Sequence, residues 1–208
     1  MTTAEKLATI AENELKVHEA GQKSEYDRFW DAFQTNGTRT TYSYVFCGFG
    51  WTDEVYQPKY NFDSVKTVNN MYFYSRLTDT KLPINLTGVT NGNTTAMFHG
   101  SAIKTIRTLT VDEKTVFSTT FNNCSALENI TFEGTIATNG LNLQWSPLTT
   151  DSMKSVISHL KNYAGTEYEG AYSVTFSETC WAALDAEGAT APNGDTWRNY
   201  MRTLGWSV

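Results

Sequence analysis

The chain has 208 residues, a formal net charge of −6 and a sequence pI near 5.1. This acidic balance argues against a nucleic-acid backbone or an anionic membrane as partner, because both repel a negatively charged protein. No apolar run approaches the roughly 18 residues that a membrane-spanning helix needs, and the first thirty residues lack the basic start and apolar block of a signal peptide. We therefore expect a protein that is made in the cytoplasm, without membrane insertion.

Residues 1–36 are predicted to form a helical N-terminal segment. Thr2 and Glu5 stand at capping-box spacing, and Asn36-Gly37 ends the helix. Two apolar stripes at helical spacing follow one another, the first made of Leu7, Ile10, Ala11 and Leu15 and the second of Tyr26, Phe29, Trp30 and Phe33. The aromatic stripe suits a cap on the following segment, and the aliphatic one offers a helix–helix seam for a homo-oligomer.

A degenerate repeat organises residues 37–145. "MFHGSAIKTI" (97–106) aligns with "FNNCSALENI", 24 residues further on, and two earlier stretches, beginning at Met71 and Val45, continue the pattern at an offset of 26. A period in the twenties is typical of stacked units that cannot bury their apolar faces alone. Each unit is expected to hold a turn with an inward Phe or Met, a bend and a short strand. The predicted strands are Lys81–Leu86, Thr108–Val111, Asn129–Glu133 and Leu141–Trp145.

The order Phe121-x-x-Cys124-x-x-Leu127-x-x-Ile130-x-Phe132 resembles the leucine-rich repeat of the BspA-like (Treponema pallidum) type. The stretches "TAEKLATIAEN", "EYDRFWDAFQ" and "WSPLTTDSMKSVI" also resemble uncharacterised repeat proteins of gut Firmicutes and their prophages. This resemblance implies an α+β fold, namely a short leucine-rich-repeat-type β solenoid with an N-terminal helix and a C-terminal α/β cap. Secreted BspA-like members bind host matrix or other cells, so the resemblance implies recognition by a phage-tail-associated or cell-surface protein. The missing signal peptide leads us to expect a virion-associated or cytoplasmic location.

Residues 146–208 are predicted to form the α/β cap. A first helix follows Ser146-Pro147, "YSVTF" (172–176) alternates as a strand, and Ser177 caps a second helix that ends at Gly188. The first and last helices of this segment carry apolar stripes, made of Met153, Val156, Ile157 and Leu160 and of Trp197, Tyr200, Met201 and Leu204.

The sequence holds no constellation typical of an active site or a metal centre. The three histidines lie in different segments, no cysteine has a second Cys or a His at ligand spacing, and nucleophile-elbow, phosphate-loop and dinucleotide motifs are absent. Cys47, Cys124 and Cys180 are expected to be buried free thiols of a protein made in a reducing compartment. We therefore predict no enzyme, no catalytic residue, no metal and no cofactor.

Two features point to binding. Aromatic residues that can stack on sugars or anchor a protein contact crowd the early repeats, as Trp51, Tyr56, Tyr60, Tyr72 and Tyr74. Polar side chains occupy the outward positions of the predicted strands and, where the alternation holds, line one sheet face. They are Lys81, Asn85, Thr108, Thr110, Thr131, Glu133, Asn142 and Gln144. The leading hypothesis is a non-enzymatic recognition or structural module that binds a protein or a cell-surface glycan through this face. The alternatives are an intracellular protein-interaction scaffold and a carbohydrate-active enzyme with a carboxylate pair across the sheet.

Overall fold

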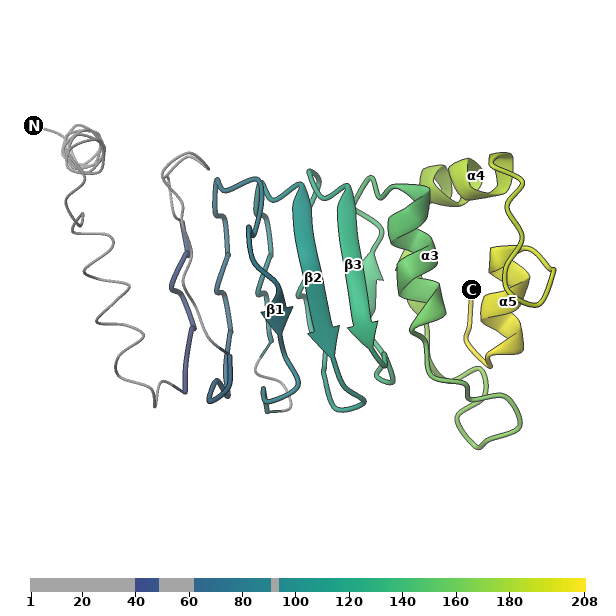
Figure 1. Cartoon of the computed structure of the whole chain (residues 1–208), viewed down its shortest axis with the longest axis horizontal. Coiled ribbons are helices and arrows are strands. Elements are labelled where there is room, and N and C mark those ends of the chain that lie inside the picture. Colours follow the sequence, from purple (N-terminus) through teal and green to yellow (C-terminus); the bar gives the residue numbers. More distant parts are fainter. Residues whose placement is uncertain (1–39, 49–61, 91–93) are drawn as a thin grey trace, which may run out of the picture.

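The computed structural model describes residues 40–48, 62–90 and 94–208 (Figure 1). The predicted helical segment 1–36, with its cap and its seam, lies outside the described residues, as do Trp51, Tyr56 and Tyr60. The strands are β1 (Ile84–Asn85), β2 (Thr105–Val111), β3 (Asn129–Gly134), β4 (Leu141–Leu143) and β5 (Val174–Phe176). The helices are α3 (Thr150–Ser158), α4 (Glu178–Ala186) and α5 (Trp197–Thr203).

The prediction of a leucine-rich-repeat-type β solenoid is wrong for the part of the chain that the structure describes. The strands within the described residues form two separate parallel sheets, one with the order β1-β2-β3 and one that pairs β4 with β5. Earlier units are joined by isolated bridges such as Thr41 to Thr67 and Asp79 to Thr105, rather than by strands. The described part of the chain is therefore a mixed α+β arrangement of small sheets and three helices.

Helix α3 explains why the first sheet ends at β3. The N–H of Ile130 donates to the hydroxyl of Ser152 at 2.9 Å, and the N–H of Phe132 donates to the hydroxyl of Ser155 at 2.8 Å. These are alternate donors along the free edge of β3, which a fourth strand would otherwise bind. Two helical serines satisfy the edge, so no further strand is added there.

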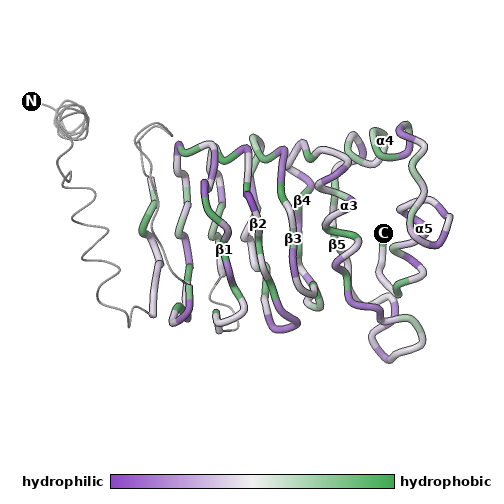
Figure 2. Tube along the Cα trace, in the orientation of Figure 1, coloured by the Kyte–Doolittle hydropathy of each residue, from purple (hydrophilic) through white to green (hydrophobic). Residues whose placement is uncertain are grey.

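Parallel pairing follows the period seen in the sequence, with one irregularity. Thr105 lies opposite Asn129 and Ile106 opposite Ile130, an offset of 24 residues. A bulge between Ile106 and Leu109 then shifts the register by one, so that Leu109 faces Phe132. Hydrophobic and hydrophilic residues alternate along β2 and β3 in Figure 2, as expected for strands with one buried face.

A column of aromatic rings holds the successive turns together. Phe46, Tyr72, Phe98 and Phe121 stack in this order, with ring centroids 4.9, 5.3 and 5.5 Å apart and planes within 20° of parallel. All four side chains are buried in the same core cluster. Ring pairs in this range stabilise beyond the area that they bury, so the turns pack firmly where strands are short or absent.

The C-terminal helices form where the sequence predicts them. Each begins at a hydroxyl residue whose oxygen accepts a backbone N–H of the first turn, namely Thr149 for α3, Ser177 for α4 and Thr196 for α5. The predicted cap at Ser177 is therefore confirmed. Among the described residues, none of the helices has the length and apolar character needed to cross a membrane.

Candidate functional site

Three of the eight predicted polar residues lie side by side across the three-stranded sheet. Asn85 on β1 is opposite Thr110 on β2, and Thr110 is opposite Glu133 on β3. The hydroxyl of Thr110 donates to a carboxylate oxygen of Glu133 at 3.1 Å. Asn85 and Glu133 are exposed and Thr110 is half-buried. The row Asn85–Thr110–Glu133 therefore presents an amide, a hydroxyl and a carboxylate to solvent on one sheet face.

The other five predicted residues lie at different places outside this row. Thr131 is exposed on β3, whereas Thr108 is half-buried in the bulge of β2. Lys81 precedes β1 with a φ of 61°, and its N–H donates to the carboxylate of Asp79. Asn142 and Gln144 belong to β4 and to the turn after it, so the structure places them with the second sheet.

A depression of about 320 Å³ lies between β2, β3 and the start of α3. Its polar lining is mainly hydroxyl and amide groups, from Thr105, Asn129, Thr131, Thr149 and Ser152, with Arg107 and Asp151 beside them. Sequence reasoning identified only Thr131. It missed Thr149 and Ser152 because they belong to a helix beyond the predicted strands, although the capping hydroxyl before an apolar stripe marked where that helix begins.

Arg107 at this depression is held by an ion pair. Its guanidinium donates to both carboxylate oxygens of Asp79, at 3.1 and 2.5 Å. Burial tends to raise the pKa of Asp79, but the hydrogen bonds from Arg107 and from the N–H of Lys81 outweigh it and hold that pKa below its usual value. The two charges of this ion pair therefore offset each other.

Of the five aromatic residues that the sequence suggests for binding, two lie within the described part of the chain, and one of these two is exposed. Tyr72 belongs to the buried column, whereas Tyr74 is 55% exposed. Tyr74 has a φ of 50°, and its ring lies so close to Gly100 that a Cβ there would stand 2.5 Å from a ring carbon. Phe73 and His99 stack beside it at 5.1 Å.

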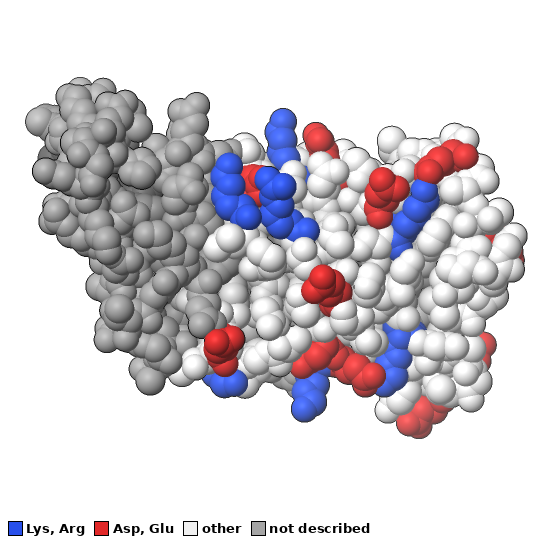
Figure 3. Space-filling view, in the orientation of Figure 1, with Lys and Arg blue, Asp and Glu red and all other residues white. Residues whose placement is uncertain are grey.

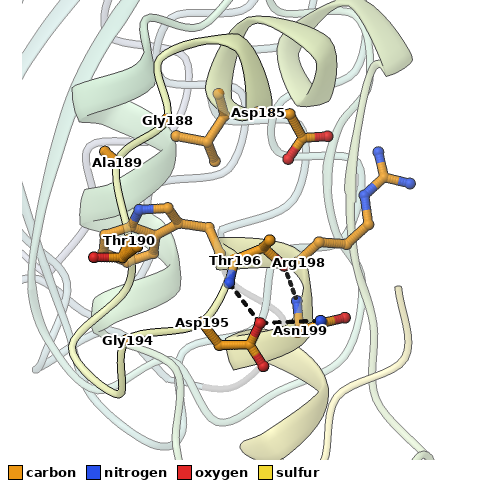
Figure 4. Close-up of a pocket in the computed structure, with 11 residues that line it drawn as sticks. Asp185, Gly188, Ala189, Thr190, Gly194, Asp195, Thr196, Arg198 and Asn199 are labelled. Atoms are coloured by element: carbon orange, nitrogen blue, oxygen red, sulfur yellow. Dashed lines mark hydrogen bonds between the residues drawn. The ribbon is translucent and has the colours of Figure 1, made fainter.

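A pocket of about 410 Å³ lies between the end of α4 and the start of α5 (Figure 4). Asp185, Thr190, Asp195, Trp197 and Arg198 are among the residues that line it. The indole N–H of Trp197 and the Nε–H of Arg198 are buried and have no hydrogen-bond partner in the part of the chain that the structure describes. An unsatisfied buried donor costs roughly 1–3 kcal/mol. Sequence reasoning treated Trp197 only as part of an apolar stripe and so missed this pocket.

No group of three or more His, Cys, Asp or Glu side chains that could hold a metal ion is found in the described ranges. The cysteines differ in exposure: Cys124 and Cys180 are buried as expected, whereas Cys47 is exposed, which corrects that expectation. Cys47 is exposed because it lies in an outer turn, next to the buried Phe46. The Cys124 thiol donates to the carbonyl of Phe98 at 3.0 Å, and burial raises its pKa to about 12.

We expect Cys47 alone to react rapidly with a thiol reagent in the native protein. Cys124 and Cys180 should react only after unfolding, since burial denies access and keeps Cys124 protonated.

Between pH 9 and about 12 the folded state retains the Cys124 proton that the unfolded chain releases, so the free energy of unfolding should fall as the pH rises through this window. Thiol counting and alkaline denaturation measure the two effects, with Cys124→Ala as the variant that loses this pH dependence. Rapid native labelling of two or three thiols would contradict the prediction.

No family model matches the chain, and no curated protein or solved structure matches it either.

Proposed function

We propose that the protein is a non-enzymatic recognition module that binds a cell-surface glycan through the exposed face of the β1-β2-β3 sheet. One observation carries the proposal, namely the row Asn85–Thr110–Glu133 on the same sheet as a depression lined by hydroxyl and amide groups. Sugar hydroxyls both donate and accept hydrogen bonds, so they suit a lining of hydroxyls, amides and a carboxylate. The volume of the depression is at the lower end of the range of small-molecule sites.

The distribution of charge supports a neutral ligand. In Figure 3 most of the surface across the middle of the described part is uncharged, and Lys, Arg, Asp and Glu gather mainly toward the upper and lower edges of the view. The guanidinium of Arg107 is already paired with Asp79. A neutral glycan needs no large field of one sign, whereas a polyanion is bound mainly through unpaired cations.

A blocking substitution tests the proposal. Thr131 is exposed and lines the depression, so Thr131→Arg should fill it without touching the core. We expect retention on immobilised bacterial cell-wall polysaccharide to fall at least about tenfold, equivalent to 1.4 kcal/mol. Bacterial polysaccharide is the first probe because of the resemblance to proteins of gut Firmicutes and their prophages.

Thr175→Arg is the matched control, since Thr175 is an exposed threonine on β5 of the other sheet. It should leave retention unchanged. If Thr131→Arg were retained as strongly as Thr175→Arg and the parent protein, the sheet face would be excluded as the binding site. Retention that protease treatment of the probe abolishes would favour a protein contact instead, and release of shortened sugars would favour the carbohydrate-active enzyme.

A further inference from the structure

We propose that a second surface of the protein binds a neutral oligosaccharide by stacking sugar rings on two exposed aromatic side chains. The surface is a row of four residues, which we call the aromatic row, made of Tyr74, Gly100, Asn123 and Trp145. None of them lies on β1, β2 or β3 or lines the depression beside those strands. The inference therefore does not depend on the proposed sheet site.

The four residues occupy the same position in the turns of four successive repeat units. Each turn is closed by a hydrogen bond from a backbone N–H to the carbonyl three residues earlier, with distances of 3.0 to 3.3 Å. The residues that donate these closing bonds are Ser75, Ser101, Cys124 and Ser146. Each member of the aromatic row comes directly before one of them in the chain.

The four units are stacked in order by backbone hydrogen bonds just after the turns. The N–H of Lys104 donates to the carbonyl of Thr78 at 2.8 Å, and the N–H of Glu128 donates to that of Lys104 at 3.0 Å. The N–H of Thr149 continues the series by donating to the carbonyl of Glu128 at 2.9 Å. Chains bonded in this way lie about 4.8 Å apart, so the two ends of the row are separated by roughly 14 Å. One sugar ring cannot reach both aromatic rings, whereas a short chain of sugars can.

Tyr74 is exposed in a backbone conformation that large side chains avoid. Its φ is 50° and its side chain is 55% exposed. Gly100 and Asn123 also have left-handed φ values, of 62° and 56°, but glycine and asparagine adopt that conformation at a lower cost. Strain of this kind clusters at functional sites. At the other end of the row Trp145 is 52% exposed, so both rings are accessible to a ligand.

The ring of Tyr74 is held in one orientation before any ligand arrives. Phe73 and His99 meet it edge to face, with centroids 4.6 and 5.6 Å from its own. The ring lies directly over Gly100, where a Cβ would stand 2.5 Å from a ring carbon. A ring that is already fixed loses little freedom on binding, which favours affinity.

Polar amides lie between and beside the two rings. Asn123 and Gln144 are exposed and Asn122 is half-buried. Among the described residues Asn122 and Gln144 form hydrogen bonds only through backbone atoms, and Asn123 forms none. Their side-chain amides are therefore available to sugar hydroxyls, which both donate and accept hydrogen bonds.

This composition favours a neutral oligosaccharide over other ligands. A sugar ring has an apolar face, which suits stacking on tyrosine and tryptophan, and hydroxyls, which suit the amides. Single-stranded nucleic acid also stacks on aromatic rings, but it needs a basic groove, and the row and the residues beside it in the turns include no Lys or Arg. A protein interface has a contiguous apolar centre, whereas Gly100 and Asn123 separate the two rings here.

Isothermal titration calorimetry with the full-length protein tests this site. The probes are β-linked hexasaccharides of glucose, mannose and xylose, together with the three monosaccharides. We expect at least one hexasaccharide to bind, and the corresponding monosaccharide to bind at least about tenfold more weakly, because only the chain engages both rings at once.

Two substitutions remove one ring each without touching the core. Tyr74→Gly introduces the residue that the next turn carries at Gly100 and so also relieves the strained φ, and Trp145→Ala shortens an exposed side chain. Each should weaken the hexasaccharide about three- to tenfold. Tyr168→Ala removes an exposed ring outside the row and is the matched control. That variant and Thr131→Arg should leave the affinity unchanged.

The proposal would be overturned if no hexasaccharide bound, if the monosaccharides bound equally well, or if Tyr74→Gly and Trp145→Ala both kept the parent affinity. Loss of binding in Thr131→Arg alone would assign the sugar to the sheet face and reject the aromatic row, so failure of one proposal is distinguishable from failure of the other. Stronger binding of oligothymidylate than of any hexasaccharide would overturn the assignment of a neutral ligand. Self-association that Trp145→Ala abolishes, measured by light scattering, would make the row a contact between copies and overturn the proposal.

Discussion

Replacing Leu127 with Asp is expected to unfold the protein. Leu127 is 1% exposed and belongs to the core cluster with Ile103, Ile106 and Ile130, as the sequence predicts. An aspartate there would be either a buried unpaired charge or a buried protonated acid, and either costs several kcal/mol. A domain of this size is stable by roughly 5–15 kcal/mol, so this one change removes a large share of its stability. Circular dichroism and the melting temperature measure the loss.

Ser125→Asp is the matched control for Leu127→Asp. Ser125 lies two residues earlier in the same bend and is exposed, so the same new carboxylate remains in water there. We expect its melting temperature to stay within a few degrees of that of the parent protein. If Leu127→Asp were equally stable, the side chain would have to leave the core, and the burial described for this bend would be wrong.

Replacing Gly134 with Ala is expected to produce the second large loss. Gly134 ends β3 opposite Val111 with a φ of 85°, and a Cβ built on it would stand 1.9 Å from the carbonyl oxygen of Val111. That oxygen belongs to the backbone of β2 and can move only if the pairing of β2 with β3 changes. We expect a loss of several kcal/mol in the free energy of unfolding, measured by denaturant titration.

Gly140→Ala separates the clash from the backbone preference. Gly140 has a φ of 93°, similar to that of Gly134, but among the described residues no atom beyond Gly140 and its two chain neighbours lies within 4 Å of the place where its Cβ would stand. This variant should lose only the roughly 1–2 kcal/mol that a left-handed conformation costs an L-residue. Equal losses for the two variants would show that the contact with Val111 does not matter.

The sequence by itself determined the local elements and the burial along them. The stripe of Met153, Val156 and Ile157 predicted α3, and Ser177 predicted the start of α4. The alternation along β2 and β3 predicted their inward side chains, because strand and helix periodicities are properties of neighbouring residues. The same alternation placed Asn85, Thr110 and Glu133 on the outward side of their strands.

Only the tertiary structure decided where the first sheet ends and where the pockets lie. A repeat pattern shows that units can stack, but it does not show that Ser152 and Ser155 of α3 bind the free edge of β3. Likewise, the spacing of Trp197 marks it as buried, but it does not show that this residue lines a pocket together with the loop that follows α4. Both features join segments that are distant in the chain, and such contacts leave no period in the sequence.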